Sequence, residues 1–176
     1  MKRRGLLLDR DGVINVDKDY VGSRDKFEFM PGIFPFLRAA QDKGFRLAIL
    51  TNQSGVGRGL YTAQDFEKLM GWVLGELRRE DIAVELTLAC FEHKDGTIPG
   101  YSRESFWRKP NPGMVLEAVQ RLNLDPARST FLGDKLTDMQ AAQAGGIGTR
   151  LFLNSKAEKA EGAISVHNFD EALEAL

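Results

Sequence analysis

The sequence alternates short apolar runs with longer amphipathic segments, and this alternation restricts the fold more than any other feature. Apolar runs typical of buried strands lie at residues 5–8, 45–50, 84–91, 129–132 and 147–153, with a short last run at 163–166. Segments with helical spacing of apolar residues occupy 31–43, 62–79, 112–122 and 136–144, and a last one starts at 168. Strands that are apolar on both faces predict a parallel sheet with helices on both sides.

Local signals mark several boundaries in this pattern. Thr62 is the predicted N-cap of the second helix, and Gly44 follows the end of the first. Asn111 before Pro112 predicts an N-cap followed by proline at the first helical position. Residues 92–107 form a connection longer than a simple loop, which is typical of functional or mobile segments. The polar stretch 154–162 is predicted to be a surface loop or a short exposed helix.

Length and charge exclude several classes of protein. The 176 residues suit a single domain over 1–176, and 43% hydrophobic with 28% charged residues excludes a disordered chain or a coiled coil. A net charge of −1 argues against a general nucleic-acid binder. The apolar run after the basic start ends at Asp9, too early for an exported segment, and no run is long enough to span a membrane. Cys90, the one cysteine, cannot form an internal disulfide, which favours a reducing compartment. The chain is expected to be cytoplasmic and monomeric, without membrane partners.

Polar side chains gather where the predicted strands end. Asp9 and Asp11 follow the first strand, Thr51 follows the second, and Asp134 follows the fourth. Lys109 stands just before a helix. Ligands of open parallel sheets bind beyond the carboxyl ends of the strands, so the fold should gather these residues into one site.

The chemistry of these residue types points to phosphoryl transfer. Asp9, Asp11 and Asp134 offer hard oxygen ligands that suit Mg²⁺, and Lys109 and Lys135 can neutralise anionic oxygens. An aspartate can attack phosphorus itself, and a second carboxylate two residues on can act as general acid and base. Each feature alone fits an ordinary polar turn or helix cap, but their joint order favours a catalytic site.

In these motifs the chain resembles the haloacid dehalogenase superfamily of phosphatases. The superfamily has Asp-x-Asp-Gly, a Ser or Thr after the second strand, a Lys before a helix and a late Gly-Asp-x-x-x-Asp. The chain is more similar still to the heptose-1,7-bisphosphate 7-phosphatase family, through residues 9–21, 51–55, 58–59, 108–114 and 133–142. The resemblance implies a Rossmann-like α/β fold of the haloacid dehalogenase type. Because the segments after Asn15 and Arg58 are short, no large cap domain is expected.

The resemblance also implies a role for each matching residue. Asp9 is similar to the family's nucleophile and Asp11 to its general acid/base. Asp9 and Asp134, with the backbone carbonyl of Asp11, would hold Mg²⁺. The residues that would stabilise the transferring phosphoryl group are Thr51 and Lys109. The residues implied in binding a small sugar-phosphate substrate are Asp17, Lys18, Asp19, Tyr20, Asn52, Gln53, Ser54, Arg58, Arg108 and Lys135.

The implied reaction is removal of the 7-phosphate from D-glycero-D-manno-heptose 1,7-bisphosphate through an aspartyl-phosphate. That step leads toward the ADP- or GDP-heptose precursors of lipopolysaccharide. Two alternatives stay open: a histidinol-phosphate phosphatase, which has similar motifs, and a non-hydrolytic receiver module. A receiver carries its phosphoacceptor Asp after a middle strand, where this chain has Asn52 or Glu92.

The chain departs from the family at one loop. Many members bind zinc through Cys-x-His and Cys-x-Cys just before the Arg-Lys motif. Here Cys90 remains, but Glu92, Ser105 and Trp107 stand at the other three positions, with His93 as a near neighbour. Structural zinc needs about four ligands, usually Cys or His, so no zinc is expected.

Overall fold

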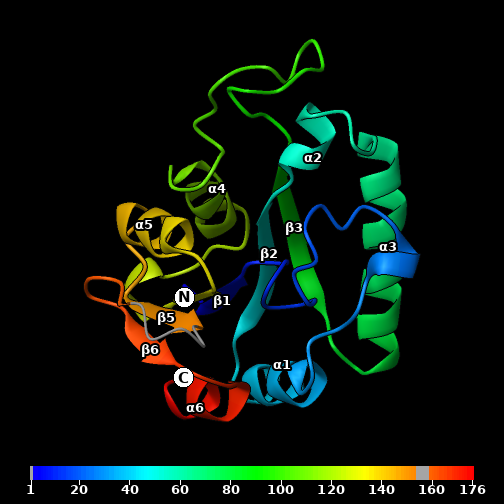
Figure 1. Cartoon of the computed structure of the whole chain (residues 1–176). Helices are drawn as coiled ribbons and strands as arrows, with labels where there is room; N and C mark the ends of the chain where they lie inside the picture. The colour runs from blue at the N-terminus through cyan, green and yellow to red at the C-terminus, as the bar shows by residue number, and fades with distance from the viewer. Residues whose placement is uncertain (1, 154–158) are drawn as a thin grey trace.

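A computed structural model describes residues 2–153 and 159–176, and its centre is a parallel six-stranded sheet (Figure 1). The strands lie in the order β3-β2-β1-β4-β5-β6, and each neighbouring pair is parallel. Helices cover both faces, so the predicted Rossmann-like α/β class is confirmed. The strand bounds are β1 Gly5–Leu8, β2 Arg46–Asn52, β3 Val84–Cys90, β4 Thr130–Gly133, β5 Thr149–Leu153 and β6 Ile164–Val166.

Alternate side chains of the buried strands feed two cores. Leu6 and Leu8 of β1 pack with the helices α1, α3 and α6, whereas Leu7 packs with α4 and α5 on the other face. Figure 1 shows α4 and α5 on one side of the sheet and α1 and α3 on the other. The helix bounds are α1 Ile33–Asp42, α2 Ser54–Gly57, α3 Ala63–Arg79, α4 Gly113–Arg121, α5 Leu136–Ala144 and α6 Phe169–Glu174, with short 3-10 turns at Arg24–Lys26 and Pro126–Arg128.

The helix starts follow the local signals in one case and not in another. Thr62 caps α3 as predicted: its hydroxyl accepts from the Asp65 N–H at 3.0 Å, and the Asp65 carboxylate accepts from the Thr62 N–H at 3.0 Å. The predicted N-cap at Asn111 is wrong. Helix α4 begins at Gly113 with Pro112 in the N-cap position. The side chain of Asn111 instead donates to the Ser105 carbonyl at 3.0 Å.

The strand order reverses between β1 and β4, which creates a crevice at their carboxyl ends. The chain leaves β1 toward β2 and β3 on one side and returns to β4, β5 and β6 on the other. β2 runs two residues further than predicted, since Thr51 and Asn52 pair with Ala89 and Cys90 of β3. Both residues are therefore the last of the strand rather than the first of a loop.

The predicted surface loop or short exposed helix at 154–162 lies partly outside the described residues, which resume at 159. Over 2–153 and 159–176, no helix has the length and apolar character that a membrane span requires.

Candidate active site

Lys109 and Asp9 form a buried ion pair at the centre of the crevice. Asp9 directly follows β1 and is 4% exposed, while Lys109 is 2% exposed. The Lys109 Nζ lies 2.8 Å from Asp9 Oδ1 and 2.6 Å from Asp138 Oδ1, and it donates to the Leu50 carbonyl at 2.8 Å. One ammonium group is thus fixed between two carboxylates, with little freedom to swing away.

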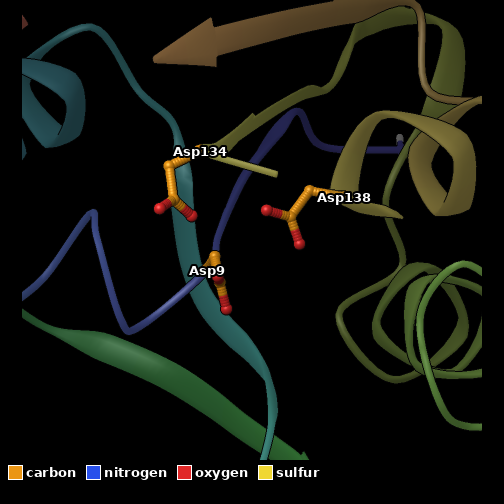
Figure 2. A group of neighbouring side chains, drawn as sticks. All are labelled: Asp9, Asp134 and Asp138. Carbon is orange, nitrogen blue, oxygen red and sulfur yellow. The ribbon is translucent and has the colours of Figure 1, made fainter. Parts of the chain in front are cut away.

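Asp9, Asp134 and Asp138 form a cluster of three carboxylates (Figure 2). They come from the end of β1, the end of β4 and helix α5, and one oxygen of each lies within 4.8 Å of the others. Oδ1 of Asp134 is buried without a hydrogen-bond partner. Three carboxylates beside one ammonium leave excess negative charge, and an all-oxygen donor set of this kind fits a hard divalent cation such as Mg²⁺.

Asp138 is the member of the cluster to which the sequence analysis assigned no role. Its signal is the last Asp of the Gly-Asp-x-x-x-Asp motif at 133–138. The spacing of four residues turns the Asp138 side chain back toward the strand end, where its carboxylate also accepts from the Lys135 N–H at 3.1 Å.

The crowded charges shift the titration of the cluster. Burial, together with the charge of Asp138, raises the pKa of Asp9 to about 6, although Lys109 opposes the shift. Burial and the charges of Asp9 and Asp138 raise the pKa of Asp134 to about 8. Burial would lower the pKa of Lys109, but the two carboxylates beside it raise the pKa overall. A bound cation would offset the repulsion between these carboxylates and stabilise their ionised forms.

Gly12 gives the cluster the space it needs. Its φ of +87° is a left-handed conformation that glycine adopts without penalty. A Cβ at this position would lie 2.0 Å from Asp134 Oδ2. The third residue after Asp9 must therefore be glycine for the carboxylate of Asp134 to reach its place.

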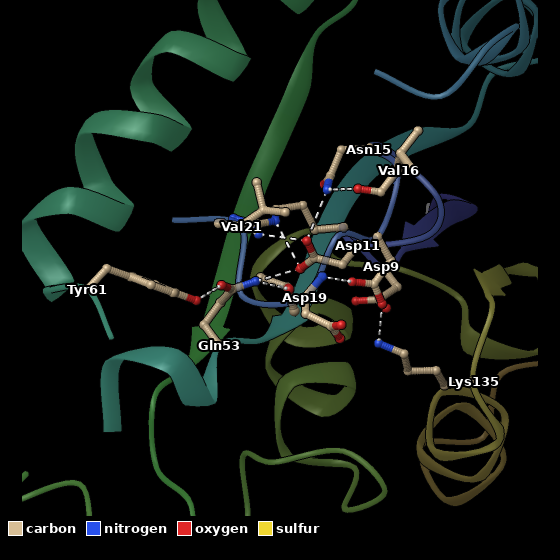
Figure 3. A network of polar contacts seen from close by, with 12 residues as sticks. Asp9, Asp11, Asn15, Val16, Asp19, Val21, Gln53, Tyr61 and Lys135 are labelled. Atoms are coloured by element: carbon tan, nitrogen blue, oxygen red, sulfur yellow. Dashed lines mark hydrogen bonds and ion pairs between the residues drawn. The ribbon is translucent and has the colours of Figure 1, made fainter. Parts of the chain in front are cut away.

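Asp11 is not a member of the carboxylate cluster, and its side chain lies in a network of donors (Figure 3). Arg10 binds it in a bidentate manner, with Nη2–Oδ1 at 2.7 Å and Nε–Oδ2 at 3.1 Å. Asn15 Nδ2 and Gln53 Nε2 donate to it at 3.0 and 2.9 Å. Burial opposes ionisation, but Arg10 and these donors hold the pKa of Asp11 below its usual value. The ionised carboxylate is the form that a general base needs, and the role of its backbone carbonyl toward a metal stays a prediction.

Gln53 joins Thr51 to the Asp11 network. Thr51 is fully buried, and its hydroxyl accepts from Gln53 Nε2 at 2.8 Å. Tyr61 donates to Gln53 Oε1 at 2.5 Å. Burial raises the pKa of Tyr61 to about 12, so the phenol remains a donor and fixes the orientation of the amide. The sequence analysis assigned no role to Tyr61 or to Arg10. Tyr61 orients Gln53, and Arg10 binds the carboxylate of Asp11.

The side chain of Asn52 positions the backbone of Lys109. Its Nδ2 donates to the Lys109 carbonyl at 3.0 Å, and its Oδ1 accepts from the Lys109 N–H at 3.1 Å. These two hydrogen bonds tie the segment before α4 to the end of β2. They bring Lys109, which the sequence places before a helix, to the carboxyl ends of the strands.

A hollow of about 360 Å³ opens beside Asp11 and Lys109. Lys135 pairs with Asp17 at 3.0 Å across its rim. Two of the residues predicted to bind substrate do not line it: Lys18 pairs with Glu28 at 2.6 Å, and Arg58 faces His93. The predicted residues that line the hollow are Asp11, Asp17, Asp19, Tyr20, Asn52, Gln53, Ser54, Arg108, Lys109 and Lys135.

Cys90 makes local contacts at the end of β3. Its Sγ lies 3.3 Å from Glu92 Oε2, and Glu92 also pairs with Arg103 at 3.1 Å. Burial raises the pKa of the Cys90 thiol to about 11, and Cys90 is the one sulfur donor at the four positions concerned. Together with the carboxylate and the hydroxyl at the other positions, this donor set does not fit structural zinc.

Comparison with known proteins gives a consistent result. A family model of haloacid dehalogenase-like hydrolases matches residues 5–146. The chain is 43% identical over 153 residues to the D-glycero-alpha-D-manno-heptose-1,7-bisphosphate 7-phosphatase of Burkholderia mallei, covering 87% of this chain and 81% of that protein. It is 40% identical over 158 residues to the D-glycero-beta-D-manno-heptose-1,7-bisphosphate 7-phosphatase of Yersinia pestis, covering 89% and 84%.

A solved structure is similar over nearly its full length. It is the D,D-heptose 1,7-bisphosphate phosphatase from B. bronchiseptica, complexed with magnesium and phosphate. The TM-score is 0.84 at 26% sequence identity, and the match covers 98% of this chain and 97% of that one.

Proposed function

The chain belongs to the haloacid dehalogenase-like hydrolases, and from this premise we propose that it releases the 7-phosphate of D-glycero-D-manno-heptose 1,7-bisphosphate. Relatives named for this activity are 40–43% identical over most of the chain. The observation that carries the proposal is the Lys109 ammonium fixed between Asp9 and Asp138, beside a hollow lined by Arg108 and Lys135. These cations suit a substrate with more than one phosphate.

In the first half of the reaction, a carboxylate oxygen of Asp9 attacks the phosphorus. The bond from phosphorus to the sugar oxygen breaks as the bond to Asp9 forms, which gives an aspartyl-phosphate. Lys109 and the hydroxyl of Thr51 stabilise the charge that spreads over the phosphoryl oxygens. Asp11 delivers a proton to the departing sugar oxygen, so this half requires the protonated acid.

In the second half, water attacks the phosphorus of the aspartyl-phosphate. Asp11 accepts a proton from that water, inorganic phosphate leaves, and the carboxylate of Asp9 is restored. The donors around Asp11 already favour its ionised form, which supports the base role in this half. Gln53 holds Asp11 and Thr51 in a fixed relation during both halves.

The metal in this proposal is Mg²⁺. Asp9 and Asp134, with the backbone carbonyl of Asp11, would hold it, and Asp138 completes the carboxylate cluster. The bound ion would neutralise charge on the phosphoryl oxygens and orient them for in-line attack.

The role of the product belongs to this proposal, whereas the domain organisation, oligomeric state and location rest on the sequence alone. The product, heptose 1-phosphate, would serve the synthesis of ADP- or GDP-heptose for cell-surface polysaccharide. One phosphatase domain over 1–176, a monomeric state and a cytoplasmic location remain predictions of the sequence. Relatives named for the alpha and the beta anomer are similarly close, so both anomers belong in any test.

A substrate panel tests the proposal. Steady phosphate release is measured with both anomers of the heptose bisphosphate and with histidinol phosphate, with Mg²⁺ present. We expect kcat/KM to be highest for one of the bisphosphates. Faster turnover of histidinol phosphate would reassign the substrate, and stoichiometric phosphorylation without turnover would indicate a receiver. Asp9→Asn serves as the control for contaminating phosphatases.

A further inference from the structure

The ring of Tyr61 occupies a slot between two glycines. A Cβ on Gly22 would lie 2.4 Å from the Tyr61 ring, and a Cβ on Gly55 would lie 2.3 Å from it. A side chain at either position would therefore displace the ring. Tyr61 also packs against the core beneath α1 and α3. The surrounding backbone and core thus set where the phenol hydroxyl lies.

The Tyr61 hydroxyl donates to Gln53 Oε1 at 2.5 Å, as the dashed line in Figure 3 shows. Among the described residues, Gln53 supplies its one hydrogen-bond acceptor. Burial raises the pKa of Tyr61 to about 12, so the hydroxyl keeps its hydrogen at neutral pH. The amide oxygen of Gln53 therefore faces a fixed donor.

The amide nitrogen of Gln53 uses both of its hydrogens. Nε2 donates to Asp11 Oδ2 at 2.9 Å and to Thr51 Oγ1 at 2.8 Å. A reversed amide would turn Oε1 toward Asp11 and Thr51 and Nε2 toward Tyr61. The phenol oxygen could accept from Nε2, but its own hydrogen would then lose its acceptor. The Tyr61 hydroxyl therefore favours the observed orientation over the reversed one.

The orientation of this amide decides where the hydroxyl hydrogen of Thr51 points. Because Thr51 Oγ1 accepts from Gln53, its own hydrogen is free to point elsewhere. Thr51 is fully buried two residues beyond Ile49, whose partner Leu8 directly precedes Asp9. In the proposed reaction this hydrogen is donated to the phosphoryl group on Asp9. With a reversed amide, it would instead be donated to Gln53 Oε1.

Asp11 supports the observed orientation only during part of the reaction. Its ionised carboxylate repels an amide oxygen, but in the first half of the proposed reaction Asp11 carries the proton that it delivers. A protonated carboxyl can donate to an amide oxygen, so it no longer opposes a reversal of Gln53. Tyr61 takes no part in the proposed proton transfers, and its contact with Gln53 is therefore available in both halves.

We propose that Tyr61 is a positioning residue, which acts through Gln53 to direct the hydroxyl hydrogen of Thr51 to the transferring phosphoryl group. This inference rests on the proposed phosphoryl transfer to Asp9, but not on the identity of the sugar. The donation from Thr51 strengthens as charge spreads over the phosphoryl oxygens in the transition state. Loss of the Tyr61 hydroxyl should therefore act on kcat more than on KM.

Tyr61→Phe tests the proposal, because it keeps the ring in its slot and removes only the hydroxyl. We expect kcat to fall about two- to ten-fold, the range for one neutral hydrogen bond, with little change in KM. Tyr61 also lines the catalytic hollow, so a direct contact with the sugar must be distinguished. The fall in kcat should be similar for the heptose bisphosphate and for p-nitrophenyl phosphate, which has no sugar.

A double-mutant cycle identifies Thr51 as the residue on which Tyr61 acts. In the Thr51→Val background, which lacks the hydroxyl, Tyr61→Phe should cause no further fall in kcat. In Thr51→Ser, which retains a hydroxyl, the fall should remain. Calorimetric titration with orthovanadate, an analogue of the phosphoryl group in its transition state, gives a readout that does not require turnover. The dissociation constant of vanadate should follow the same pattern across the variants.

Tyr101→Phe is the matched control. It makes the same chemical change on a ring that packs edge-on against Phe91, with ring centroids 5.8 Å apart, so kcat should not change. Melting temperatures establish that all variants are folded.

The outcomes separate this inference from the proposed function. A wild type that hydrolyses no phosphate ester contradicts the proposed function. An active wild type with unchanged kcat in Tyr61→Phe overturns the positioning role and leaves the proposed function intact. The same role is overturned if the loss is confined to the heptose substrate, or if it persists in full in the Thr51→Val background.

Discussion

The catalytic edge of the sheet and the loop 92–107 adjoin each other but are built differently. At the sheet edge, Asp9, Lys109 and Asp138 are at most 4% exposed and hold one another by ion pairs. In the loop, Phe106 is 60% exposed and Trp107 37% exposed. The side chains proposed for chemistry are thus fixed by the core, whereas side chains proposed for substrate recognition lie beside a peripheral segment.

Polar contacts tie the loop to the end of α2 and to itself. The N–H groups of Thr97 and Ile98 donate to the Gly57 carbonyl at 2.8 and 3.0 Å, and His93 N–H donates to the Tyr101 carbonyl at 3.0 Å. In the Glu92–Arg103 pair the arginine side chain is 65% exposed, and pairs with a solvated partner contribute about 0–1 kcal/mol. We therefore expect substitutions at the sheet edge to lower kcat/KM for every substrate, and substitutions near the loop to lower it for selected substrates.

The largest effect is expected for Asp9→Asn. An amide cannot attack phosphorus, so kcat should fall about 10⁴-fold or more for every phosphate ester. The melting temperature should not fall, because the change removes one charge from a crowded cluster. Phosphate release and thermal unfolding measure the two effects. Normal turnover in this variant would break the assignment of chemistry to the sheet edge.

Asp11→Asn should lower kcat by about 10²–10⁴-fold, the usual contribution of a general acid or base. Unlike Asp9→Asn, it should also lower the melting temperature, because the fully buried Arg10 loses its bidentate carboxylate partner. Circular dichroism and steady-state kinetics on the two variants together check this. A melting temperature equal to that of Asp9→Asn would contradict the structural part of the argument.

Arg108→Ala and Lys109→Ala compare the two regions through adjacent residues. Arg108→Ala should lower kcat/KM about ten- to a hundred-fold for the bisphosphate and much less for p-nitrophenyl phosphate. Lys109→Ala should lower kcat/KM for both, because its ammonium lies beside Asp9. Equal losses on both substrates in Arg108→Ala would mean that the division between chemistry and recognition does not run between these residues.

The affinity for Mg²⁺ should depend on pH at the sheet edge. Without metal, the pKa of Asp9 is raised to about 6 and that of Asp134 to about 8, so both carboxyls favour their protons over the metal in mild acid. Because Mg²⁺ needs the ionised forms, its dissociation constant should increase at least about ten-fold from pH 8 to pH 6. Calorimetric titration at the two pH values measures it. A pH-independent constant would show that these carboxyls are not the ligands.

The smallest effect is expected at the loop, where zinc should be absent. Elemental analysis after removal of adventitious metal should find no stoichiometric zinc, and a zinc-selective chelator should leave the melting temperature unchanged. The reason is the donor set of Cys90, Glu92, Ser105 and Trp107. One zinc per chain would instead mean that a metal site holds the loop in place. The proposed difference in rigidity between the loop and the sheet edge would then be wrong.

The sequence predicted the sheet edge better than the loop, for physical reasons. Continuous apolar runs that end in a carboxylate place Asp9 and Asp134 at adjacent strand ends once the sheet is parallel. Arg10, between two aspartates, has no local feature that indicates full burial, yet it is completely enclosed. Its position is set by tertiary contacts, including a hydrogen bond to the Val21 carbonyl at 2.7 Å.

The same limit applies to the contact between Arg58 and His93. Arg58 and His93 are 35 residues apart, and only the folded chain brings the end of α2 against the loop. Asn111 shows the limit at a helix start: its sequence favours a cap, but the Ser105 carbonyl takes its side chain. Local patterns predict where elements and charges lie along the chain, whereas hydrogen-bond partners across long separations require the structure.

The two hydrogen bonds between Asn52 and the Lys109 backbone imitate the exchange between neighbouring strands, with a side-chain amide in place of a peptide group. The end of β2 in effect gains one more pair of ladder-like hydrogen bonds, made by a side chain. Loops usually fluctuate within nanoseconds to microseconds, whereas core strands open only in rare, slower events. Because these two bonds join the Lys109 backbone to the end of β2, we expect this backbone to move with the sheet and to keep the ammonium beside Asp9.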